Sequence, residues 1–153
     1  GRIGARADEL RAMYRSWSDV GGDAVFRIPA IRLAEVQPAP VYMYRLDAAS
    51  PQFGGKLGAA HAIDLPLVWN NLANPLGQLL LGDVEPFRSV ALRVHDTCAA
   101  FARTGVPDGG GLPAWPRYDA ADRATMIIDR DTAAVERDPG RAQRELWNQL
   151  LAP

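Results

Sequence analysis

The segment that most constrains the fold is the apolar run at residues 41–46, Val41-Tyr-Met-Tyr-Arg-Leu46. Prolines precede this run and Asp47 follows it, which predicts a short strand with defined ends. A run that is apolar or aromatic at almost every position suits a central strand covered on both faces, as in α/β sheets. Such a strand needs neighbours on both sides, and the sequence does not visibly supply them. We therefore expect the chain to be part of a larger α/β sheet.

Helical periodicity and turn residues organise the rest of the chain around this strand. The expected elements are helices over 7–17, 26–34, 84–104 and 141–151, and an edge hairpin over 125–128 and 133–135. The glycine pair at 21–22 predicts a turn over 19–23, and Gly105 is placed to cap the long helix. Residues 70–82 and 106–118 are expected to be loops. This alternation of helices and strands is typical of an α/β protein.

Composition narrows the classes of function. A chain of 153 residues is long enough for one domain that buries roughly 70% of its unfolded surface. The net charge of -1 gives no electrostatic basis for binding nucleic acid or an anionic membrane. No apolar run approaches the ~20 residues that a membrane span needs. The single cysteine, Cys98, excludes an internal disulfide and favours a cytoplasmic location, and on an apolar helix stripe it is expected to be inert.

A histidine among small residues is the main candidate for chemistry. The segment runs Gly58-Ala-Ala-His61-Ala-Ile-Asp64-Leu-Pro66-Leu-Val-Trp69 and follows the expected buried strand. Alanine and glycine neighbours leave the His61 ring free to turn toward a cleft, and histidine can exchange a proton near neutral pH. Asp64 can anchor the loop. The other histidine, His95, is expected at the surface or boundary of the long helix.

Four fragments in order carry a resemblance to a known family. Phe26-Arg-Ile-Pro29 is followed by Ala39-Pro-Val-Tyr-Met-Tyr-Arg45, then by His61-Ala-Ile-Asp64-Leu-Pro-Leu-Val-Trp, and finally by Phe101-Ala-Arg-Thr-Gly105 with Leu112-Pro-Ala-Trp115. Together they resemble the C-terminal portion of the type B carboxylesterases, α/β-hydrolases that include para-nitrobenzyl esterases and cholinesterases. The family usually has His-Gly-x-Glu-Leu-Pro at the third fragment. Here Ala62 stands where glycine is common, and Asp64 replaces glutamate.

The resemblance implies a fold and site roles. Residues 1–153 would form the C-terminal segment of one α/β-hydrolase catalytic domain, with a central-type strand, a histidine loop, a long helix, an edge hairpin and a terminal helix. His61 would be the catalytic histidine. Asp64 would anchor its loop, although a triad acid is possible in principle. Phe26 and Ala62 would line the substrate pocket, and an ordinary core role for Phe26 is at least as good a prediction.

The other parts of a serine esterase site are missing from the sequence. None of the four serines has glycine at both minus two and plus two, so no nucleophile elbow is present. We expect a small ester as substrate, and the N-terminal part of the same enzyme as partner and source of the nucleophile and acid. The chain alone would be inactive. The alternative is a non-catalytic, cholinesterase-like binding or scaffold protein.

No metal or cofactor is expected. Two histidines without vicinal cysteines do not make a zinc-ligand set. Asp19 and Asp23 flank two glycines, but the EF-hand spacing and its terminal glutamate are missing. We expect a turn there, with a helix-capping aspartate.

Overall fold

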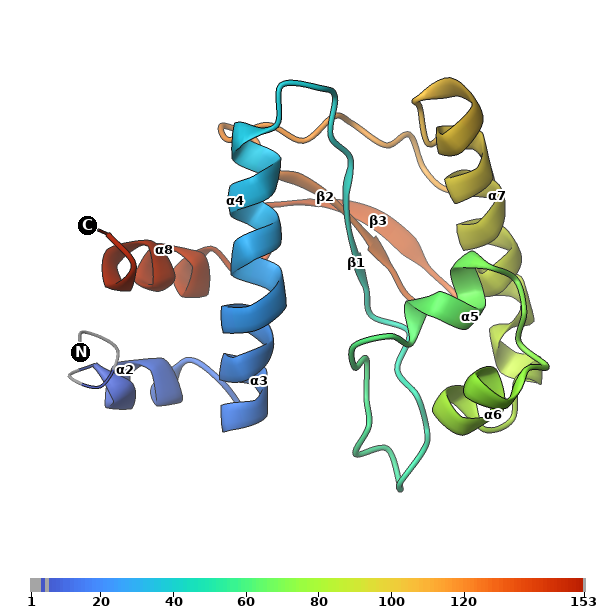
Figure 1. The fold of residues 1–153 in the computed structure, drawn as a ribbon, viewed down its shortest axis with the longest axis horizontal. Coiled ribbons are helices and arrows are strands. Elements are labelled where there is room, and N and C mark those ends of the chain that lie inside the picture. Colours follow the sequence, from blue (N-terminus) through green and yellow to red (C-terminus); the bar gives the residue numbers. More distant parts are fainter. Residues whose placement is uncertain (1–3, 5, 153) are drawn as a thin grey trace.

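The computed structural model describes residue 4 and residues 6–152 (Figure 1). Its sheet contains β1 (Met43–Leu46), β2 (Ala124–Ile128) and β3 (Ala133–Arg137), in that spatial order. β1 runs parallel to β2, whereas β2 and β3 form the expected antiparallel hairpin. Parallel neighbours need a long crossover, and here the chain between them forms α5, α6 and α7. The fold is α/β, as the sequence predicts.

The central and C-terminal parts of the described chain contain four α-helices. They are α5 (Asp64–Val68), α6 (Pro75–Leu81), α7 (Arg88–Thr104, preceded by a 3-10 turn at Glu85–Phe87) and α8 (Arg141–Leu150). The predicted long helix and terminal helix are confirmed. Gly105 caps α7 with a left-handed φ of 75°. The expectation of a loop over 70–82 is wrong, because Asn74 caps α6 by accepting a hydrogen bond of 2.9 Å from the Gly77 amide.

The N-terminal helices differ from the prediction. α2 (Ala7–Ala12) ends earlier than expected, and α3 (Trp17–Gly22) occupies the expected turn. Ser16 starts α3 through a capping box: its hydroxyl accepts from the Asp19 amide at 3.1 Å, and the Asp19 carboxylate accepts from the Ser16 amide at 2.9 Å. This cap sets the helix start and places the glycine pair inside the helix. The predicted turn over 19–23 is therefore wrong.

α3 continues through a single π-helical turn, η1 (Asp23–Arg27), into α4 (Ile28–Val36). The amide of Ile28 donates to the carbonyl of Asp23, five residues back. Pro29 explains the wider turn, because proline has no amide to donate and its ring clashes with the carbonyl four residues earlier. Asp23 does not cap a turn. It accepts hydrogen bonds from Tyr14 at 2.6 Å and Arg27 at 2.7 Å.

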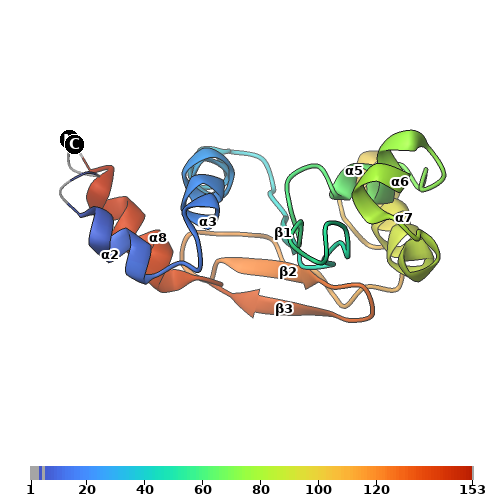
Figure 2. The same ribbon diagram turned by 90° about the horizontal axis from the view of Figure 1, so that it is seen from below.

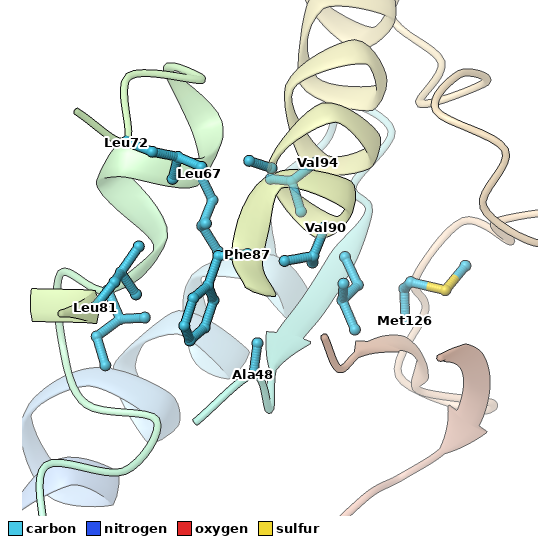
Figure 3. Packing of buried hydrophobic residues seen from close by; sticks show 11 residues of the cluster. Ala48, Leu67, Leu72, Leu81, Phe87, Val90, Val94 and Met126 are labelled. Carbon is cyan, nitrogen blue, oxygen red and sulfur yellow. The ribbon is translucent and has the colours of Figure 1, made fainter. Parts of the chain in front are cut away.

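Two apolar cores hold these elements together. The larger core packs α5, α6 and α7 against β2 (Figure 3). Its buried residues are Ala48, Ile63, Leu67, Leu72, Leu81, Phe87, Val90, Ala91, Val94, Met126 and Ile128. The smaller core joins the N- and C-terminal helices, and its buried residues are Leu10, Val20, Ile28, Leu146, Trp147 and Leu150. α2 and α8 accordingly lie side by side in both views (Figures 1 and 2).

The buried strand of the sheet is β2, whereas the sequence predicted that the run forming β1 would be buried on both faces. All five residues of β2 are buried, whereas Tyr44 and Arg45 of β1 are exposed and Met43 and Leu46 are half-buried. β1 lies at the edge of the described sheet, because no other strand of residues 6–152 pairs with its second side. Within this sheet β2 is the central strand. In the part of the chain that the structure describes, no helix has the length and apolar character to cross a membrane.

Candidate active site

His61 lies on the loop that joins the end of β1 to the start of α5. The first part of this loop folds back on itself through a bridge between Ser50 and Gly58. Ser50 is buried, and its hydroxyl donates to the carbonyl of Leu80 at 2.5 Å. The following residues turn sharply into α5, since the Ile63 amide donates to the Ala60 carbonyl at 3.3 Å. His61 itself is exposed on this anchored loop.

The residue after the histidine adopts a left-handed backbone. Ala62 has a φ of 71°, a conformation that glycine adopts without the steric cost that a Cβ brings. This conformation turns the chain from the histidine into α5, because the Ala62 carbonyl accepts the Leu65 amide at 3.2 Å. It also gives a backbone reason why a glycine suits this position.

The ring of Phe26 stacks on the ring of His61. The ring centroids are 4.3 Å apart and the planes differ by 13°, which is a near-parallel stack. Phe26 projects from the π-helical turn η1, so two segments 35 positions apart in the sequence meet at this point. The side chain of Phe26 is still 48% exposed, and it is not a core residue. The structure therefore brings together two of the predicted site residues.

Asp64 turns toward the sheet. Its carboxylate accepts a hydrogen bond of 3.1 Å from the hydroxyl of Tyr44 on β1, and within residues 6–152 it makes no hydrogen bond to His61. Although Tyr44 is 36% exposed as a whole residue, its neighbours keep water from the phenol. This burial of the phenol, with a contribution from the nearby Asp64 charge, raises the pKa of Tyr44 well above its usual range. Tyr44 therefore stays a hydrogen-bond donor at neutral pH. The contact ties the first turn of α5 to the strand that precedes the histidine loop.

A small apolar hollow lies beside this contact, between β1 and α7. Its lining residues are Tyr44, Val94, Thr97, Cys98, Leu112, Trp115 and Ile128. Burial, followed by the Asp64 charge, raises the pKa of the Cys98 thiol, so the thiolate is disfavoured. The indole of Trp115 donates to the Met43 carbonyl at 3.1 Å and fixes the 106–118 loop against β1. The hollow is a packing feature, and Cys98 fills part of its wall.

The remaining candidates have structural partners. His95 is half-buried, and its Nδ1 lies 2.9 Å from the Val68 carbonyl, which links α7 to the end of α5. Among the serines, Ser16 caps α3 and Ser50 anchors the loop, as described above. In the part of the chain that the structure describes, no three His, Cys, Asp or Glu side chains gather in a way that would hold a metal ion.

The Tyr44–Asp64 and Phe26–His61 contacts were not anticipated as pairs. Each pair joins residues far apart in the sequence, and no local pattern indicates that their side chains meet. The resemblance indicated Phe26, His61 and Asp64 one by one, whereas Tyr44 was noted only as part of the apolar strand.

The structure is that of an α/β protein in which a histidine-bearing loop follows a strand of a parallel pair. The model of the carboxylesterase family matches residues 4–147, and the chain belongs to this family, the type B carboxylesterases. It is 35% identical over 143 residues to phenmedipham hydrolase from Pseudarthrobacter oxydans, covering 90% of this chain and 29% of that protein. It is 30% identical over 128 residues to the para-nitrobenzyl esterase of Bacillus subtilis, covering 80% of this chain and 25% of that enzyme.

Solved structures of carboxylesterases also superpose on this chain. A para-nitrobenzyl esterase structure superposes with a TM-score of 0.73 at 30% identity, covering 86% of this chain and 26% of that one. A Geobacillus stearothermophilus carboxylesterase structure superposes with a TM-score of 0.71 at 35% identity, covering 86% of this chain and 27% of that one. The architecture is thus that of part of an α/β-hydrolase. The chain spans less than a third of the length of these relatives.

Proposed function

We propose that this chain supplies the catalytic histidine of a serine carboxylesterase, which hydrolyses small carboxylic esters. The observation that carries the proposal is the placement of His61. It lies exposed on an anchored loop beyond the carboxyl end of a strand in a parallel pair, where ligands of open α/β sheets bind. Family membership supports the reaction class, and the sequence around His61 resembles the histidine motif of the family.

His61 would act first as general base and then as general acid. A serine hydroxyl is a weak nucleophile at its own pKa, so His61 would remove its proton as the oxygen attacks the ester carbonyl. The same proton would pass to the departing alcohol, which leaves an acyl-serine. His61 would then take a proton from water, the resulting hydroxide would attack the acyl carbon, and the proton would return to the serine.

Asp64 would support this chemistry from a distance. Its hydrogen bond with Tyr44 holds the far end of the histidine loop to β1, which suits a loop-anchoring role better than that of triad acid. Ala62 would set the direction of the loop through its left-handed backbone and border the pocket beside the histidine. In these roles Asp64 and Ala62 would lie near the reacting groups, and neither would donate or accept a proton.

The nucleophile, acid and oxyanion hole would come from the N-terminal part of the same enzyme. Two features support such a partner. The second side of β1 has no strand partner within residues 6–152, and the α3–α4 and α5–α6 segments carry strongly exposed apolar side chains. Examples are Val25 at 63%, Leu33 at 65% and Trp69 at 72% exposure. The relatives are also more than three times as long as their matched segments.

The test is turnover of para-nitrophenyl acetate by the native protein that contains this chain, whose polypeptide composition is first established by intact mass. We expect His61→Ala to lower kcat by at least about 10³-fold, as loss of a triad member does. His95→Gln is the matched control, because it changes the other histidine of the chain and should retain turnover. Full activity of His61→Ala would overturn the proposal.

A non-catalytic, cholinesterase-like scaffold is the alternative. It would be favoured if the native protein, with its complete polypeptide present and folded, turns over no ester and has no serine in a Gly-x-Ser-x-Gly elbow. The exposed position of His61 beside an aromatic ring favours catalysis, since a scaffold has no need of an accessible imidazole at this loop.

A further inference from the structure

We propose that Phe26 is a positioning residue that fixes the plane of the His61 imidazole by stacking on one of its faces. The inference rests on the proposed role of His61 as the proton-transferring base. It assigns to the π-helical turn η1 a part in the reaction, which is to present an aromatic ring to the catalytic loop. Phe26 itself touches His61 and transfers no proton.

The geometry of the stack supports this assignment. Both nitrogens of an imidazole lie at the edge of the ring, and a catalytic base uses both: one faces the nucleophile and the other faces the orienting acid. A near-parallel neighbour covers a face and leaves the edge free. At a centroid separation of 4.3 Å and an angle of 13°, rotation of the imidazole about its Cβ–Cγ bond would drive its edge into the Phe26 ring. The stack therefore restricts the ring plane while leaving both nitrogens accessible.

His61 needs such a contact because its own loop does not restrain the ring. Its immediate neighbours are alanines, it is exposed, and no hydrogen bond to its ring forms within residues 6–152. The Tyr44–Asp64 hydrogen bond holds the backbone three residues later and does not reach the imidazole. The aromatic contact is thus the interaction that selects a ring orientation in the described part of the chain.

The turn that carries Phe26 is well held. Arg27 donates to Asp23 at 2.7 Å and also to the carbonyl of Pro139, and Ile28 is buried in the smaller core. Asp23 also accepts from Tyr14. A π turn inserts one extra residue into a helix and rotates the side chains that follow it. Here it places Phe26 on the histidine while the next residues stay anchored.

Kinetics can separate positioning from a role in the pocket wall. In the native esterase, Phe26→Leu removes the flat ring while retaining apolar volume, and Phe26→Tyr retains the ring. We expect Phe26→Leu to lower kcat about tenfold, by a similar factor for acetate, butyrate and hexanoate esters, with KM little changed. Phe26→Tyr should restore kcat to within about twofold. Ala24→Ser, at an exposed position on the same turn, is the matched control.

A spectroscopic measurement tests the contact itself. A ring stacked face to face shifts the carbon-bound protons of the imidazole upfield, so the His61 signals of the native protein should move downfield in Phe26→Leu and stay near their original positions in Phe26→Tyr. The signals are assigned by their loss in His61→Gln. Unchanged His61 signals in Phe26→Leu would overturn the proposal.

The kinetic outcomes also keep the two proposals distinct. If His61→Ala is inactive while Phe26→Leu retains full kcat, the positioning role is wrong and the proposed function stands. A loss in Phe26→Leu that grows with acyl length and falls mainly on KM makes Phe26 a pocket wall, and again overturns positioning. If His61→Ala retains turnover, the proposed function is wrong, and so is the positioning role that rests on it.

Discussion

The phenol of Tyr44 on β1 donates a hydrogen bond of 3.1 Å to the carboxylate of Asp64, the first residue of α5. The bond spans the histidine loop: its donor lies before the loop and its acceptor lies just after it. The loop is therefore held at both ends by the same pair of side chains. This arrangement explains how residues 47–63 can carry an exposed histidine without losing a defined path.

Removal of this bond should loosen the loop. Tyr44→Phe keeps the ring and deletes the donor, and we expect a loss of about 1 kcal/mol in the free energy of unfolding, because a neutral donor to a carboxylate is lost at a partly exposed site. The measurement is the urea midpoint of the native protein. Tyr42→Phe is the control, since it deletes a hydroxyl just before β1 that makes no hydrogen bond to the loop within residues 6–152. Equal midpoints for Tyr44→Phe and wild type would contradict the expectation.

The same phenol predicts an alkaline loss of stability. The pKa of Tyr44 is raised in the folded state, first by burial and then by Asp64, so folding favours the protonated phenol. Its contribution is complete below the unfolded pKa, about 10, and is lost as the pH rises toward the folded pKa. Unfolding free energy measured from pH 8 to 11 should fall more steeply for wild type than for Tyr44→Phe. Parallel curves would be inconsistent with the raised pKa.

The left-handed backbone of Ala62 predicts a stabilising substitution. At a φ of 71° the Cβ of alanine is unfavourable, and Ala62→Gly should raise the unfolding free energy by about 1 kcal/mol. The control is Ala59→Gly in the same loop, where φ is not positive and added chain entropy should lower stability. Thermal midpoints of the two variants should move in opposite directions. A fall for Ala62→Gly would show that the loop relaxes around alanine.

A buried ion pair sets the acid sensitivity of the C-terminal helix. Asp138 accepts two hydrogen bonds from Arg144, at 2.8 and 2.7 Å, and both side chains are 10% exposed or less. The Arg144 hydrogen bonds hold the pKa of Asp138 below its usual value, against the opposing effect of burial. Stability from this pair is thus present above the unfolded pKa, about 3.9, and is lost as the pH falls through the lower folded pKa.

Asp138→Asn should cost about 3 kcal/mol at pH 7, because it removes the close carboxylate from buried Arg144 and leaves only the more exposed Glu145 at 3.6 Å. Asparagine also tolerates the φ of 50° at this position, so the backbone is unchanged. Asp131→Asn, in an exposed pair with Arg130, should change stability by less than about 0.5 kcal/mol. Chemical denaturation at pH 7 and pH 3 measures the free energy of unfolding of both variants. The difference in this free energy between wild type and Asp138→Asn should be smaller at pH 3 than at pH 7.

Two glycines provide a matched test of space in the fold. Gly21 lies in α3 with open space where a Cβ would go, and Gly21→Ala should stabilise the protein by about 0.5–1 kcal/mol. Gly77 lies in α6, where a Cβ would collide with the backbone carbonyl of Leu72, and Gly77→Ala should cost about 2 kcal/mol. Thermal unfolding of both variants is the measurement. Stabilisation by Gly77→Ala would show that the turn before α6 can move.

Local patterns in the sequence were sufficient to predict much of this structure. The apolar stripe and Gly105 predicted α7, and the spacing of Leu146, Trp147 and Leu150 predicted α8. Two short, mostly apolar segments joined by a charged turn predicted the hairpin. The ordered fragments around His61 indicated the family, which the family match confirms. These features depend on neighbours within a few residues, where helix and strand periodicity is a direct consequence of backbone geometry.

Tertiary contacts decided the rest. Glycines inside α3 and a proline after η1 oppose a continuous helix locally, but burial of Val20 and Ile28 in the smaller core outweighs them. β2 is also more buried than β1, because β2 has a neighbouring strand on each side within the described sheet. The Phe26–His61 and Tyr44–Asp64 contacts bring together segments 35 and 20 positions apart. Such pairings depend on how whole elements pack. The sequence by itself therefore determined α7, α8, the hairpin and the histidine motif, while packing determined what surrounds the histidine.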